Sequence, residues 1–200
     1  MFAANEQGPS FLYQNFDGRF VDRAVEYGVD DARQNGRGTA LADILYDGRL
    51  GIIIGNWNGY HRAYVPARHS FLDYATEAFR EPSLVRTVIS ADFDNDGFDE
   101  IFFNNIGQPN RMFRVRDGGV LEPVALSAAL EADGLGTGAA VADMDGDGVL
   151  DLLVAHGESA PQPLSLFRAA MDGPGRYLRI APLTGQGAPA RGATVILETD

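Results

Sequence analysis

A unit of about fifty residues is repeated three times in this chain. Each copy has an Ala-Asp pair at the end of a run of small residues, a glycine five positions after the aspartate, and then a short apolar run. The three aspartates, Asp43, Asp92 and Asp143, are 49 and 51 residues apart. A repeat of this length restricts the fold to architectures in which similar units stack against one another.

The pattern inside each unit predicts short strands. The apolar runs have strand length, and a second short run that carries an aromatic residue follows each of them at a steady distance. A related run at 11–15 precedes the first unit, and Asp17-Gly18 after it predicts a two-residue hairpin turn. Between strands, only 121–130 offers one or two helical turns. We therefore expect an all-β chain of β-propeller blades with four antiparallel strands each, about three blades (37–75, 84–126 and 135–169) after a half blade.

Three and a half blades are fewer than a closed propeller needs. We therefore expect a fragment of a longer protein, or a chain that a partner completes, and the fragment is the preferred interpretation. Total blade number, ring closure and oligomeric state stay open. Residues 1–7 show neither a basic segment nor an apolar run, so no signal peptide is visible there.

Charge and composition exclude several classes of function. The chain has 28 acidic and 16 basic side chains and a net charge of −12, which argues against nucleic acid and anionic membrane surfaces as partners. No apolar run approaches the roughly 18 residues of a membrane-spanning helix, so we expect no membrane insertion. The absence of cysteine excludes disulfide scaffolds, thiolate zinc sites and cysteine nucleophiles.

Two nine-residue loops have the acidic pattern of a metal-binding site. Each places acids at positions 1, 3, 5 and 9 around a glycine at position 6, and Ca²⁺ prefers such hard oxygen ligands. Four carboxylates at close quarters repel one another, so we predict that Ca²⁺ binds here in a structural role. The predicted ligands are Asp92, Asp94, Asp96, Glu100 and the carbonyl of Phe98 in one loop, and Asp143, Asp145, Asp147, Asp151 and the carbonyl of Val149 in the other.

An EF-hand also begins with D-x-D-x-D-G, but it needs an acid at position 12 and a helix on either side. Position 12 is Phe103 in one loop and Val154 in the other, and both lie in strand-like runs. The EF-hand is therefore rejected. The first repeat keeps only Asp43 and Asp47, so it is interpreted as a plain hairpin turn, and whether the loop from Asp43 to Gly51 binds any ion stays open.

The acidic loops between strands resemble the FG-GAP/VCBS repeats of integrin α-subunit propellers. The segments 55–59, 102–105 and 156–159 are more specific and resemble the cartilage acidic protein family and its bacterial relatives, and the resemblance implies a bacterial member of that family. Residues 176–180 and 187–195 resemble the start of the ASPIC/UnbV domain. The resemblance implies propeller repeats over 1–173 and the beginning of a small β domain over 174–200. It also implies a secreted calcium-binding protein used in interaction or adhesion.

We therefore expect an extracellular or periplasmic calcium-binding propeller module that recognises a protein or a glycan and is not an enzyme. The rival interpretation is a propeller-borne lyase or hydrolase whose catalytic residues lie elsewhere or are not evident. Ser159 is a poor nucleophile candidate because Pro161 and Pro163 forbid the helix that a nucleophile elbow requires. Trp57 either stacks on a sugar or packs between blades, and packing is the preferred interpretation. The partner's identity and the source organism stay open.

Overall fold

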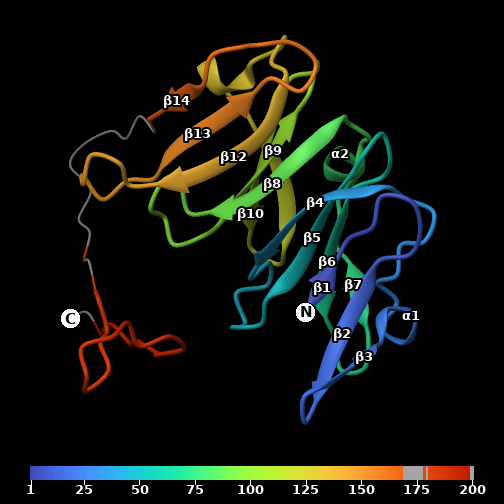
Figure 1. The fold of residues 1–200 in the computed structure, drawn as a ribbon, viewed down its shortest axis with the longest axis vertical. Helices are drawn as coiled ribbons and strands as arrows, with labels where there is room; N and C mark the ends of the chain where they lie inside the picture. The colour runs from blue at the N-terminus through green and yellow to red at the C-terminus, as the bar shows by residue number, and fades with distance from the viewer. Residues whose placement is uncertain (169–177, 179, 199–200) are drawn as a thin grey trace.

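The computed structural model of the chain describes residues 1–168, 178 and 180–198. Its strands form four antiparallel sheets, in which strands that follow one another in sequence pair side by side (Figure 1). The first sheet contains β1 (Phe2–Ala3), β2 (Phe11–Phe16) and β3 (Arg19–Asp22). The second contains β4 (Gly36–Ala42), β5 (Gly51–Asn56), β6 (Arg62–Pro66) and β7 (Phe71–Asp73). The third contains β8 (Val85–Ala91), β9 (Glu100–Asn105), β10 (Arg111–Arg116) and β11 (Val120–Val124), and the fourth contains β12 (Gly136–Ala142), β13 (Asp151–His156) and β14 (Ser165–Phe167).

Helical structure is limited to three short elements between the strands: α1 (Ala24–Tyr27), α2 (Glu77–Arg80) and the 3₁₀ turn η1 (Ala128–Leu130). The predicted all-β architecture of propeller-like blades is confirmed, and the sheets match the expected unit boundaries within a few residues. Asp17 and Gly18 form the β2–β3 turn with φ of 49° and 88°, as their sequence predicts. Among the described residues the fourth sheet has three strands.

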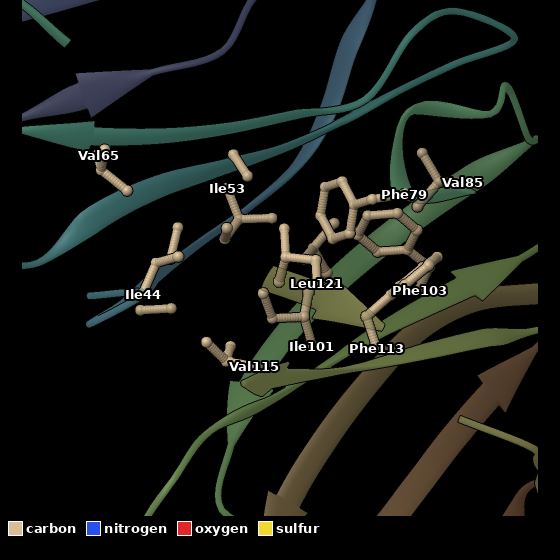
Figure 2. Packing of buried hydrophobic residues seen from close by; sticks show 13 residues of the cluster. Ile44, Ile53, Val65, Phe79, Val85, Ile101, Phe103, Phe113, Val115 and Leu121 are labelled. Carbon is tan, nitrogen blue, oxygen red and sulfur yellow. The ribbon is translucent and has the colours of Figure 1, made fainter. Parts of the chain in front are cut away.

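The sheets stack face to face, which explains why the apolar strands β5 and β9 are buried along their whole length. Ile53 of the second sheet and Phe103 and Phe113 of the third belong to one buried cluster (Figure 2). Phe79 of α2 joins it, with its ring centroid 5.1 Å from that of Phe103. Smaller clusters lie between the first and second sheets and between the third and fourth. Each sheet is therefore stabilised mainly by burial against its sequence neighbours.

The first strands of three sheets, β4, β8 and β12, lie side by side. Each has the same irregularity of register near its start, between Gly36 and Gly38 in β4 and at the equivalent residues of β8 and β12. Gly38 permits the approach of β4 to β8, because a Cβ atom there would lie 2.7 Å from the backbone nitrogen of Val88. The equivalent glycine in β12, Gly138, has open space at its Cβ position.

Trp57 lies at the junction of the second and third sheets. The guanidinium carbons of Arg37 and Arg86 lie 4.7 and 4.6 Å from its ring centroid, and Trp57 forms a one-residue bridge with Ser83. These contacts agree with the interpretation of Trp57 as packing between blades.

The described C-terminal residues 180–198 form a turn closed by a single bridge between Leu183 and Pro189, with no strand in that range. The predicted domain boundary between residues 173 and 174 lies outside the described residues. In the described part of the chain, no helix has the length and apolar character needed to cross a membrane.

The contrast between Gly38 and Gly138 gives a matched pair of variants. Gly38→Ala should lower the free energy of unfolding by about 1–3 kcal/mol, because the new methyl group forces β4 away from β8. Gly138→Ala, which meets no atom within 4 Å, should leave the urea midpoint nearly unchanged. Equal losses in the two variants would contradict the close packing of β4 on β8.

Candidate metal centre

The loop between the first and second strands has one backbone form in the second, third and fourth sheets. In each, the first aspartate accepts a hydrogen bond from the backbone N–H of the glycine five residues later, which has a positive φ that favours glycine. The bonds run from Gly48 to Asp43 (2.7 Å), from Gly97 to Asp92 (3.0 Å) and from Gly148 to Asp143 (3.2 Å). The turn is thus fixed by the first aspartate and the glycine.

Two of these loops bring three carboxylates together. In each group one oxygen per residue lies within 4.8 Å of the others; the groups are Asp92, Asp94 and Glu100, and Asp143, Asp145 and Asp147. Ca²⁺–oxygen distances of 2.3–2.6 Å allow two ligands of one ion to be at most about 5 Å apart. Both groups therefore fit a single calcium ion in spacing and in donor chemistry.

The ninth-position acids are the buried members of the loops, with Glu100 1% and Asp151 5% exposed. Glu100 accepts a hydrogen bond from the backbone N–H of Phe93 at 3.0 Å, and Asp151 accepts the equivalent bond from Met144 at 3.1 Å. Each ninth-position acid therefore ties the start of its loop to the second strand.

Two of the eight predicted carboxylates, Asp96 and Asp151, lie outside the three-residue groups. Asp96 accepts a hydrogen bond from the backbone N–H of Phe98 at 2.9 Å, which holds the turn at that point. The carbonyl oxygens of Phe98 and Val149 stay predicted ligands.

Burial and mutual repulsion act on the acids of the third sheet's loop. Burial raises the pKa of Asp92, and nearby Asp96 and Asp94 raise it further, against the lowering effect of the backbone N–H groups of Gly97 and Asp96. Burial also raises the pKa of Glu100. The net shift of the pKa disfavours the charged forms of both acids even with Arg114 hydrogen-bonded to Glu100, and a divalent cation would oppose that shift.

Sequence reasoning missed two arginines that contact the loops. The Arg114 guanidinium donates a hydrogen bond to Glu100 at 3.1 Å and also pairs with Asp94. Arg168 lies 2.8 Å from a carboxylate oxygen of Asp145. The sequence does contain a signal for both arginines. Each is the last residue of an aromatic run, R-M-F-R or S-L-F-R, whereas the equivalent run of the first unit, R-A-Y-V, ends in valine.

The loop of the second sheet keeps the turn and its acids Asp43 and Asp47, but it lacks the acids of the third and ninth positions. Arg49 pairs with Asp47 inside this loop. At the ninth position, a Cβ atom on Gly51 would lie 2.5 Å from the carbonyl oxygen of Tyr64, so the backbone there excludes a side chain. Neither three-residue group of metal-capable side chains found among the described residues includes this loop.

The three loops lie next to one another at one end of the sheets. Asn95 donates a side-chain hydrogen bond to the carbonyl oxygen of Gly148 at 3.0 Å, which joins the two acidic loops. The rings of Tyr46 and Phe98 meet edge to face with centroids 4.1 Å apart, which joins the loop of the second sheet to its neighbour. A change in one loop therefore reaches the next through direct contact.

Comparison with known proteins finds repeat sequence in the part of the chain that contains both acidic loops. Residues 56–154 match the model of the FG-GAP-like repeat family, a range that contains the complete third sheet. The whole chain aligns with cartilage acidic protein 1 of Homo sapiens at 51% identity over 212 residues, covering 32% of that protein. The proteins of the same name from Mus musculus and Xenopus tropicalis are each 50% identical over 212 residues, with 33% of their length covered.

The chain thus spans about a third of the length of the curated relatives it matches. The expectations of a bacterial source and of a fragment stay predictions. The chain carries FG-GAP-like repeat sequence and is similar along all its residues to cartilage acidic protein 1.

Proposed function

We propose that this chain is a calcium-binding extracellular repeat module whose ions stabilise the turns between blade strands, and that the module serves recognition of a protein or a glycan. The observation that carries the proposal is the pair of three-carboxylate groups, each compact enough for one ion. The extracellular placement is supported by the FG-GAP-like repeat and by the similarity to cartilage acidic protein 1.

In this proposal, Asp92, Asp94 and Glu100 hold one ion, and Asp143, Asp145 and Asp147 hold the other. A bound ion offsets the repulsion among the carboxylates that lie close together at the turn between the first two strands. Because Glu100 is both a ligand and an anchor for the loop's start, its ion would tie the turn to β9. Extracellular modules of this kind bind Ca²⁺ with dissociation constants near 10⁻⁴–10⁻³ M.

Recognition is proposed in preference to catalysis. His156, the histidine nearest in sequence to Ser159, has its Nδ1 2.7 Å from the carbonyl oxygen of Pro163 and its Nε2 3.2 Å from Glu131. Ser165 donates to Glu131 at 2.6 Å, so the carboxylate lies between that hydroxyl and the imidazole. These contacts engage both ring nitrogens of His156, which does not favour its use as a general base for either serine.

Calorimetry with calcium chloride tests the metal sites. We expect two sites in the unmodified chain, and one after either Asp94→Asn or Asp145→Asn, because each change removes a carboxylate from one group. Asp47→Asn, which changes the loop of the second sheet, is the control and should retain both sites. Absence of calcium heat in the unmodified chain would overturn the proposal.

Calcium should also raise the melting temperature. With dissociation constants in the range given above, 10 mM Ca²⁺ adds about 1–3 kcal/mol of stability per site by mass action. Differential scanning calorimetry in calcium chloride and then in EDTA should show a reversible difference, and equal Mg²⁺ should give a smaller one, because Mg²⁺ loses its water reluctantly. Identical melting curves in calcium and EDTA would exclude a structural role for the ion.

Arrays of glycans and extracellular proteins test the recognition role. A saturable signal that EDTA removes and calcium restores would support it, because the ion-stabilised loops shape one end of the module. Turnover of a polysaccharide or an ester by the chain, lost on changing a residue outside the acidic loops, would instead support the lyase or hydrolase alternative.

A further inference from the structure

The two arginines that contact the acidic loops occupy equivalent places in their sheets. Arg114 in β10 is the register partner of Glu100 in β9, the ninth-position acid. Arg168 directly follows Phe167, whose register partner is Leu152, so it comes opposite the other ninth-position acid, Asp151. Arg114 therefore lies within the third strand of its sheet and Arg168 directly after the third strand of the next, each opposite the acid that closes its loop.

The second sheet lacks both halves of this pairing. Ile52 pairs with Tyr64 in that sheet, so the next residue pair along the strands is Gly51 and Val65. The ninth-position acid and the opposing arginine are thus absent together, while the turn itself is retained. An arginine present only for solubility would not be expected to occur together with the ninth-position acid.

The two pairings differ in strength. Arg114 pairs with two carboxylates, Asp94 and Glu100, and its side chain is 26% exposed. Arg168 pairs with Asp145 and its side chain is 63% exposed. Charge interactions are stronger where solvent screens them less, so Arg114 should influence its loop more than Arg168 influences the other.

We propose that Arg114 and Arg168 are built-in counter-cations that stabilise the calcium-free loops and compete with the divalent ion, so that the loop at 92–100 binds calcium more weakly than the loop at 143–151. This inference rests on the proposed calcium-binding function. A cation that enters the loop at 92–100 must displace Arg114 from Asp94 and Glu100 or share those carboxylates with it. Either event reduces the net attraction for the ion.

The test is calorimetric titration of calcium into the 200-residue chain in which Asp145→Asn prevents binding at the loop 143–151. In that background, Arg114→Gln should tighten calcium binding roughly tenfold, because a positive charge beside the ion is removed. The same variant should melt at a lower temperature in EDTA, because the loop loses its counter-charge. Arg114→Lys, which keeps the charge, should stay within about threefold of the parent affinity.

Arg33→Gln is the matched control, because it removes an equal charge from an exposed residue that precedes β4, at the end of the strand opposite to the loops. It should leave calcium affinity unchanged. In the Asp94→Asn background, Arg168→Gln should increase the calcium affinity of the loop at 143–151. This increase should be smaller than the effect of Arg114→Gln on the loop at 92–100, because Arg168 is more exposed and pairs with one carboxylate.

A second measurement does not need an arginine variant to fold. With both arginines present, the loop at 143–151, measured in Asp94→Asn, should bind calcium more tightly than the loop at 92–100, measured in Asp145→Asn. The reverse order, or unchanged or weaker binding in Arg114→Gln, would overturn the counter-cation role and leave the calcium function standing. No calcium heat in any variant, the unmodified chain included, would overturn both.

Discussion

A single aspartate carboxylate holds each turn that joins the first and second strands of a sheet. Its oxygens accept backbone N–H groups of the loop, and the pattern recurs in the second, third and fourth sheets, whether or not the other acids are present. The strands β4, β8 and β12 each lead directly into one of these turns, and they also lie against one another. The positions of the loops therefore depend on how the sheets stack.

The acidic loops concentrate negative charge where the backbone is already fixed. Glu100 is nearly inaccessible to solvent, and its repulsion with neighbouring carboxylates is offset in this structure by Arg114. A divalent ion would supply two charges where the arginine supplies one, at the same carboxylates. In the second sheet, Gly51 and Val65 stand in place of the acid and the arginine, and the turn is still held by the hydrogen bonds of Asp43 and Asp47.

Much of the fold follows from the fifty-residue repeat, because an apolar strand that recurs after an acidic turn has few ways to bury both faces. The sequence also predicted the Asp17-Gly18 hairpin and the position of each acidic loop. It did not predict α1 and α2, since four-residue helices have too few turns to show a period. Arg114 was missed because its partner Glu100 is fourteen residues away and becomes a neighbour only through strand register.

The proposed calcium sites place divalent ions between the carboxylates of two adjacent loops. The most direct measurement is a crystal structure of the chain grown in calcium chloride, with anomalous scattering used to identify the ion. We expect one calcium against Asp92, Asp94 and Glu100 and another within 143–151, with none in the loop of the second sheet. Ordered loops that contain no ion at millimolar calcium, with Arg114 still paired to both acids, would contradict this expectation.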